Sequence, residues 1–283
     1  MFQFPIVDAH LHLWDVNKLK YPWLEGIPLL NKTFLLEDYN RACGPLNVEK
    51  MVFMQCECEP NRYLEEVQWV TELARVDQRI QGIVSFAPLE KGEAVRAELE
   101  VLKSNPLVKG IRRIIQNEED LAFCLQPNFI AGVNMLPEYG FTFDICIDER
   151  HTRNAIHFVE QCPNVKFMLD HIGKPNIKEH RLDPWREEIK QLSAFPNVYC
   201  KTSSLASEAD HLSWTIEDLK PFVNHIFDCF GYERTVFAGD WPVSSLAADL
   251  QVCVETLVKL THGASEAQLT QLFYSNAIKF YDL

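Results

Sequence analysis

The segment KMVFMQCECEPNRYLEEVQWVTELARV, residues 50–76, contains the structural unit from which the rest of the chain is built. Its first part, residues 50–57, is short and mostly apolar, which predicts a buried strand. Its second part has apolar residues at helical spacing, namely Leu64, Val67, Val70, Leu73 and Ala74. The segment therefore predicts one strand followed by one amphipathic helix.

The same succession of a strand and a helix occurs eight times along the 283 residues. The predicted strands cover residues 4–10, 50–57, 80–87, 108–115, 141–147, 165–171, 197–203 and 234–240. A further helix over residues 266–281 ends the chain, and residues 17–30 predict a loop inserted after the first strand. This pattern favours the α/β class and a (β/α)8 TIM-type barrel, as a single domain over residues 1–283 with an extra C-terminal helix. A doubly wound open sheet is the alternative, although it rarely carries so many units in one domain.

Composition excludes several classes of partner. The formal net charge of −13 argues against binding to nucleic acid or to an acidic membrane surface. The nine cysteines have no spacing typical of a zinc knuckle or a disulfide framework, and the first residues lack the features of a secretory signal. We therefore expect a cytoplasmic protein that acts on a small molecule, and the sequence leaves open whether it forms a homo-oligomer.

Polar residues stand where the predicted strands end, which is where a barrel of this type has its active site. Ionisable groups that converge there would lose hydration, and a fold retains such groups only for a use. Since neighbouring residues of a strand point to opposite faces, one of Arg112 and Arg113 should face the barrel and the other the helices. The strand-end set is Asp8, His10, His12, Gln55, Glu57, Arg112, Arg113, Asp144, Asp170, His171, Lys174, Lys201, Asp240 and Trp241.

Some of these residues also have simpler interpretations. Asp8 could brace a histidine without touching substrate. Lys201 could be the partner of a carboxylate as readily as a ligand. Outside the strand-end set, His151 follows the fifth strand closely and is a minor candidate for the site. The remaining histidines are interpreted as ordinary surface or hydrogen-bonded residues: His157, His180, His211, His225 and His262.

A His-x-His pair at the first strand, a histidine at the sixth and an aspartate at the eighth resemble the amidohydrolase superfamily. The segments DAHLHLWD (8–15), KGIRRIIQ (109–116), LDHIGKP (169–175) and FAGDWPV (237–243) resemble its amidohydrolase-related branch of sugar-lactone and 2-pyrone-4,6-dicarboxylate lactonases. The resemblance covers nearly the whole chain. It implies that His10, His12 and His171 surround a lactone carbonyl, that Asp240 activates water, and that Arg112 binds substrate.

The chain departs from the superfamily pattern at two metal ligands. Arginine replaces the bridging lysine of the fourth strand, and Asp144 stands where the fifth strand would carry a histidine. We therefore expect no two-metal centre and no required cofactor. At most one divalent ion, zinc if any, would bind to His10, His12 and Asp240, with His171 as a further candidate. At the seventh strand the branch often has a glycine after its lysine and serine, whereas this chain reads KTSSL (201–205), which could reshape the pocket wall.

These features predict a hydrolase that opens an aldonolactone, such as a fucono- or rhamnono-lactone, with Asp240 as the base. Three alternatives stay open: a metal-dependent hydrolase of amides or other esters, a decarboxylase of the same superfamily, and a non-catalytic binder of sugar lactones. No serine or cysteine lies in a recognisable nucleophile elbow, which argues against an acyl–enzyme route. The predicted substrate contacts are Arg112, Gln55, Glu57, Asp144, Lys174, Trp241 and Trp14.

Overall fold

The computed structural model describes residues 4–283, so the first three positions of the predicted domain lie outside the described residues. Eight parallel strands form one sheet in chain order, and β1 and β8 close it into a barrel. The amide of Asp240 donates to the carbonyl of His10 at 2.8 Å across this closure. The strands are β1 (Ile6–Leu11), β2 (Val48–Met54), β3 (Ile80–Ser85), β4 (Val108–Ile111), β5 (Thr142–Ile145), β6 (Phe167–Leu169), β7 (Val198–Thr202) and β8 (Thr235–Phe237). The predicted (β/α)8 barrel is confirmed.

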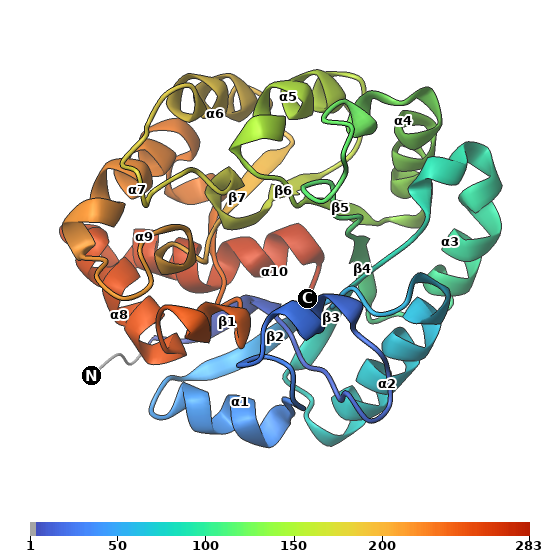
Figure 1. Ribbon diagram of the computed structural model, residues 1–283, viewed down its shortest axis with the longest axis horizontal. Coiled ribbons are helices and arrows are strands. Elements are labelled where there is room, and N and C mark those ends of the chain that lie inside the picture. The colour runs from blue at the N-terminus through green and yellow to red at the C-terminus, as the bar shows by residue number, and fades with distance from the viewer. Residues whose placement is uncertain (1–3) are drawn as a thin grey trace.

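A ring of helices surrounds the sheet, one after each strand (Figure 1). They are α1 (Leu36–Cys43), α2 (Tyr63–Val76), α3 (Arg96–Lys103), α4 (Pro127–Asn134), α5 (Thr152–Glu160), α6 (Trp185–Ser193), α7 (Ile216–Phe230) and α8 (Leu250–Leu260). Apolar side chains from the helices and from the outer faces of the strands form one large buried cluster. None of the helices in the described part of the chain has the length and apolar character needed to cross a membrane.

The buried face of α2 differs from the predicted stripe. Val67 and Val70 are buried as expected, but Leu64 is 38% exposed. The buried positions are 63, 66, 67, 69 and 70, so the inward face is turned away from Leu64 and includes Glu66. Both carboxylate oxygens of Glu66 accept from the amide of Cys56, at 3.2 and 3.4 Å. This contact gives the carboxyl group of Glu66 a hydrogen-bond partner on an otherwise apolar face.

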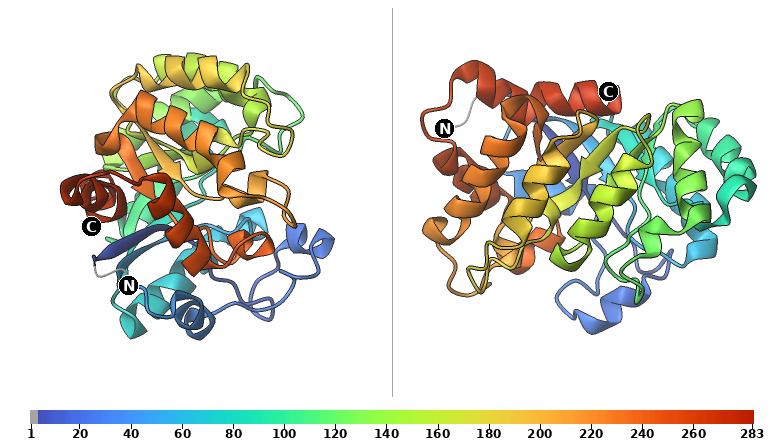
Figure 2. Two further views of the ribbon diagram at one scale, coloured as in Figure 1. Left: turned by 90° about the vertical axis from the view of Figure 1, so that its left-hand side faces the viewer. Right: turned by 90° about the horizontal axis from the view of Figure 1, so that it is seen from above.

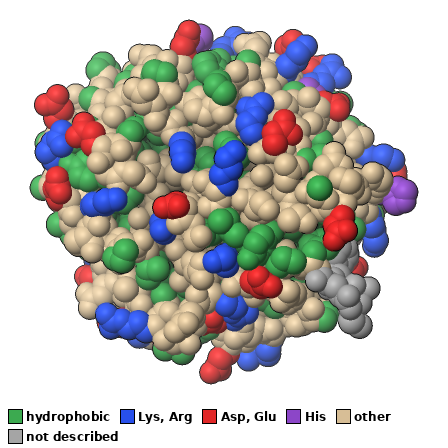
Figure 3. Space-filling view, turned by 180° about the vertical axis from the view of Figure 1, so that it is seen from behind, with side chains coloured by type: hydrophobic (Ala, Val, Ile, Leu, Met, Phe, Trp, Pro, Cys, Tyr) green, Lys and Arg blue, Asp and Glu red, His purple; other side chains and the backbone are tan. Residues whose placement is uncertain are grey.

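The predicted terminal helix is present as α9 (Glu266–Thr270), a π-helical turn (Gln271–Ser275) and α10 (Asn276–Tyr281). Ala277, Phe280 and Tyr281 pack against inward-facing strand residues such as Val7 and Val52. Figure 2 shows α10 at one end of the barrel and the blue loop that follows β1 at the other. On the face of the molecule that carries α10, acidic, basic and apolar side chains are interspersed (Figure 3). The terminal helix therefore plugs the amino-terminal end of the barrel.

Candidate active site

The two histidines of β1 and its extension point to the same side of the strand, as their alternation requires. Their Nε2 atoms lie 3.1 Å apart, and both side chains are buried. His12 Nδ1 is 2.9 Å from the carbonyl oxygen of Met54, which can only accept, so we assign the ring proton of His12 to Nδ1. Its Nε2 therefore presents a lone pair to the centre of the site.

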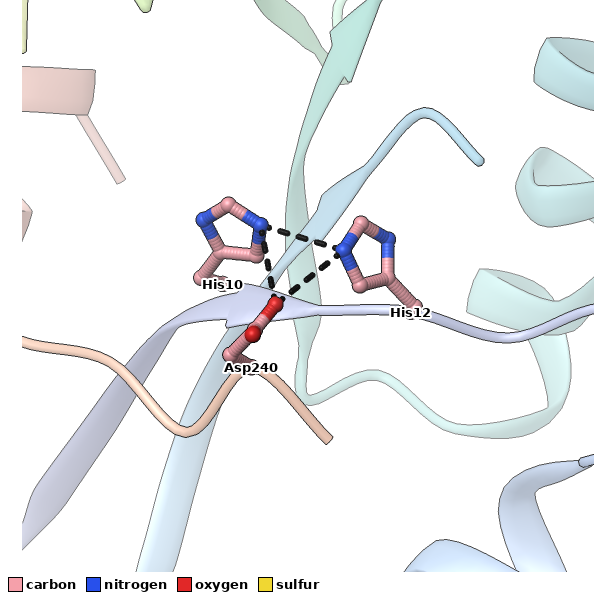
Figure 4. A group of neighbouring side chains, drawn as sticks. All are labelled: His10, His12 and Asp240. Atoms are coloured by element: carbon pink, nitrogen blue, oxygen red, sulfur yellow. Dashed lines mark hydrogen bonds and ion pairs between the residues drawn. The ribbon is translucent and has the colours of Figure 1, made fainter. Parts of the chain in front are cut away.

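Asp240 follows β8 and places its carboxylate against this pair (Figure 4). Oδ1 is 3.4 Å from His10 Nε2, 3.3 Å from His12 Nε2 and 3.9 Å from His171 Nε2. Burial raises the pKa of Asp240, but the surrounding imidazoles of His171, His12 and His10 outweigh burial and hold the pKa well below its ordinary value. Asp240 is therefore ionised at neutral pH.

The three imidazoles are neutral at the same pH. Burial lowers the pKa of His171 to about 4. Burial, followed by the positive charge of Lys201, holds the pKa of His10 well below its ordinary value, and burial also lowers the pKa of His12. Neutral rings and one carboxylate form a site that can accept and return a proton.

Two serines of the KTSSL segment support this group. Ser203 Oγ lies 2.7 Å from His171 Nδ1, and Ser204 Oγ donates to Asp240 Oδ2. We assign Ser203 as the donor, so that His171 carries its proton on Nε2, facing the carboxylate of Asp240. These two serines therefore supply hydrogen bonds to two site residues.

A buried ion network lies beneath the histidines. Lys201 Nζ is 2.6 Å from Asp144 Oδ2, 2.9 Å from Asp170 Oδ1 and 3.2 Å from His10 Nδ1. Burial lowers the pKa of Lys201, but the two carboxylates more than compensate and raise it. Lys201 is thus a charged partner of carboxylates, and it also touches a histidine of the site.

Arg112 and Arg113 point in opposite directions, as the alternation of side chains along a strand predicts. Arg112 faces the barrel, where Nη2 donates to the carbonyl oxygen of Gln55 at 2.6 Å and Nη1 lies 3.2 Å from His10 Nε2. Arg113 faces the helices, where it pairs with Glu118 at 2.5 Å and lies over the ring of Phe123. Arg112 is therefore the member of the pair available to a ligand.

A cavity of about 540 Å³ opens above His12, His171 and Asp240, whereas His10 is fully buried beneath them and does not line it. Its lining includes Arg112, Lys174 and Glu57, which remain candidate substrate contacts. Four other predicted contacts lie outside this lining. Gln55 forms hydrogen bonds with the backbone and side chain of Glu57, and Asp144 forms them with Lys201 and Tyr281. Trp241 packs against Phe34 and Tyr39. The indole N–H of Trp14 donates to the carbonyl oxygen of Lys32.

Asp8 and His151, both named from the sequence, lie outside the cavity lining, and several lining residues were not expected. Asp8 accepts from the amides of His10 and Gly239, so it ties β1 to the end of β8 and braces the backbone of His10. His151 is buried and bonds to Asp148, away from the cavity lining. Several lining residues are not predicted from the sequence: Pro22, Trp23, Ile27, Cys56, Cys58, Pro60, Ile114, Gln116, Asn117, Cys146 and Val243. Three of these come from the inserted loop, whose place after the first strand was the available signal.

Backbone strain is concentrated at the same end of the barrel. Among residues 4–283, eight non-glycine residues have positive φ, and six of them follow the carboxyl ends of strands: Glu57, His171, Ile172, Lys174, Ser204 and Asp240. Such conformations cost free energy and persist where the surrounding structure fixes them, often at functional sites. The hydrogen bonds of Gln55 to Glu57 and of Ser204 to Asp240 are two such restraints.

The donor set of His10 Nε2, His12 Nε2 and Asp240 Oδ1 fits a metal ion. These atoms are 3.1, 3.3 and 3.4 Å apart, close to the roughly 3.3–3.5 Å between ligands of a tetrahedral zinc ion. His10 also belongs to a second group with Asp170 and His171, but Asp170 is already paired with Lys201. The residues could therefore hold one ion once His10 carries its ring proton on Nδ1 and not on Nε2, and Arg112 places a positive charge beside that ion.

The amidohydrolase family model matches residues 7–283. The chain belongs to the amidohydrolase family. It is 26% identical over 292 residues to an L-fucono-1,5-lactonase of Burkholderia multivorans, covering 98% of this chain and 96% of that one. It is also 26% identical to an L-rhamnono-gamma-lactonase of Scheffersomyces stipitis, with full coverage of both chains. A zinc-bound crystal structure of an amidohydrolase from Burkholderia multivorans superposes with a TM-score of 0.89, at 26% identity and 99% and 100% coverage.

Proposed function

We propose that this amidohydrolase hydrolyses a sugar lactone. The observation that carries the proposal is the buried carboxyl group of Asp240, whose Oδ1 lies within 3.9 Å of three imidazole rings at the floor of a cavity of about 540 Å³. The lactonases among its relatives support the same reaction class. A lactone needs a base for its attacking water and donors for the oxygen that becomes charged, and the site offers both.

In this reaction Asp240 accepts a proton from water as the water oxygen attacks the lactone carbonyl carbon. The N–H groups of Arg112 and His171 stabilise the negative charge that develops on the carbonyl oxygen. Asp240 then returns the proton to the ring oxygen, which leaves as an alcohol when the tetrahedral intermediate collapses. The product is a hydroxy acid that releases its carboxyl proton to solvent, and the resulting anion is repelled by the ionised Asp240.

The residues that would hold a metal ion are His10, His12 and Asp240. If bound, a divalent ion at these atoms would polarise the carbonyl of the substrate. Arg112 already supplies a positive charge at the same place, 3.2 Å from His10 Nε2. We therefore propose that turnover does not depend on a metal.

The lining suits a hydroxylated ring with an apolar edge. Glu57, Gln116 and Asn117 can hydrogen-bond hydroxyl groups, while Trp23 and Val243 provide apolar surface. Arg112 and Lys174 can bind oxygen atoms of the substrate. We favour 6-deoxy sugar lactones of the fucose or rhamnose type, whose methyl group would use the apolar part.

The test is a pH-indicator assay across aldonolactone epimers, with unsubstituted δ-valerolactone for comparison, each with and without chelator. We expect the best sugar lactone to exceed δ-valerolactone in kcat/KM by at least about 30-fold. Each buried polar group left unpaired by the plain lactone costs roughly 1–3 kcal/mol, and two such groups at the lower limit give this ratio. Equal rates would refute a sugar site. Binding of sugar lactones without turnover would refute the enzymatic proposal and favour a binder.

A further inference from the structure

A column of polar groups runs through the barrel from its plugged end to the active site. At its base, the Tyr281 hydroxyl of α10 donates to Asp144 Oδ2 at 2.7 Å. Lys201 Nζ donates to the same oxygen at 2.6 Å and lies 5.6 Å from the centre of the Tyr281 ring. The three side chains are buried, so water does not compete for these contacts.

At the top of the column, Lys201 reaches the site itself. Its Nζ lies 2.9 Å from Asp170 Oδ1 and 3.2 Å from His10 Nδ1, in addition to the contact with Asp144. An ammonium group has three N–H donors, so all three are engaged. A shift of Asp144 would therefore move Lys201 and alter its contact with His10.

The hydroxyl of Tyr281 has a role that its ring does not provide. The ring fills space beside Phe280 and Ala277, and phenylalanine would fill the same space. Asp144 Oδ1 has no hydrogen-bond partner, so within residues 4–283 the carboxylate is oriented only by Tyr281 and Lys201. Without the hydroxyl, Lys201 alone holds the carboxylate, which can then turn about its side-chain torsions.

We propose that Tyr281 is a positioning residue, which acts through Asp144 and Lys201 to fix the imidazole of His10 in its working orientation. This inference rests on the proposed lactone hydrolysis, in which His10 lies against Asp240 at the reacting centre. The terminal helix thus serves the active site as well as closing the barrel. Small displacements of a catalytic group cost rate even when the substrate still binds.

The experiment compares Tyr281→Phe with Tyr274→Phe. Both remove one hydroxyl from the terminal helical segment, but the hydroxyl of Tyr274 contacts Glu49 at the surface, 3.2 Å away. We expect Tyr281→Phe to lower kcat about 10-fold with KM within about twofold of wild type, as losses of supporting hydrogen bonds often do. Tyr274→Phe should leave both constants within about twofold. A Tyr281→Phe enzyme with a lowered Tm and an unchanged kcat would overturn the proposal, because its role would then be structural alone.

Two further measurements keep the outcome decisive. If Tyr281→Phe does not fold, Asp144→Asn keeps the shape of the side chain while weakening its hold on Lys201, and unchanged kcat in that variant would equally overturn the proposal. If the wild-type enzyme hydrolyses no lactone, the proposed function fails, and the crystal structure of Tyr281→Phe decides the inference. An unaltered Lys201 Nζ to His10 Nδ1 distance in that structure would contradict it.

Discussion

Replacing Asp240 with asparagine should abolish most of the activity without disturbing the fold. The amide keeps the size of the carboxylate and an oxygen that can accept from Ser204. The backbone amide of residue 240 still donates to His10, and asparagine tolerates the positive φ of 52° better than most residues. The amide cannot take a proton from water, and loss of a general base costs about 10² to 10⁴ in rate. This corresponds to about 3–5 kcal/mol in the activation free energy.

The measurement is kcat on the best lactone of the panel, together with the Tm of each variant. Asp249→Asn is the matched control, since Asp249 lies exposed on the same segment after β8, at the N-cap of α8. We expect Asp249→Asn to match wild type and Asp240→Asn to keep its Tm within a few degrees. An Asp240→Asn enzyme that retains more than about a tenth of wild-type kcat would remove Asp240 from the role of base.

Three other predictions concern stability and metal. Gly239→Ala should destabilise the fold by about 1–3 kcal/mol in urea unfolding, because its Cβ would lie 2.5 Å from Asp8 Oδ2. Gly26→Ala, with open space around its Cβ, should be near neutral, and equal effects would contradict this. Burial raises the pKa of Glu66 from 4.5 to about 8, so the unfolded chain ionises first and stability falls as pH rises through that window. Glu66→Gln should remove this decline, a gain of about 3–4 kcal/mol between about pH 5 and pH 8, and a parallel decline in the variant would count against the assignment. Elemental analysis should find at most one divalent ion per chain and chelation should leave turnover intact, whereas reversible loss of activity on chelation would favour a metal-dependent hydrolase.

The barrel could be predicted from the sequence because its evidence is local and repeated. Each strand and helix has its own periodicity, and eight repetitions leave few architectures to consider. The exact face of a helix is less local. The inward position of Glu66 depends on the amide of Cys56, which approaches it only when α2 docks on the sheet.

The ring of polar residues at the strand ends was also predictable, because parallel strands of a barrel bring their carboxyl ends together. The direction of each side chain was not. Trp14 turns into the core beside Trp23 of the inserted loop, and its indole bonds to a carbonyl of that region. Gln55 points to Glu57, whose positive φ no spacing rule predicts. These side-chain directions depend on how the loops pack and where the backbone is strained, and a pattern of residue types does not reveal either.

Asp144 best illustrates how structure changes the meaning of a residue. At the end of a strand, a carboxylate is a candidate ligand, and the missing histidine of the fifth strand invites that interpretation. In the barrel it lies below the cavity lining, between Lys201 and Tyr281. A buried carboxylate and ammonium pair seldom adds net stability compared with apolar residues, because desolvation offsets the attraction. Its retention is better explained by what it holds: the lysine whose third N–H reaches His10, directly beneath the pair of imidazoles that faces Asp240.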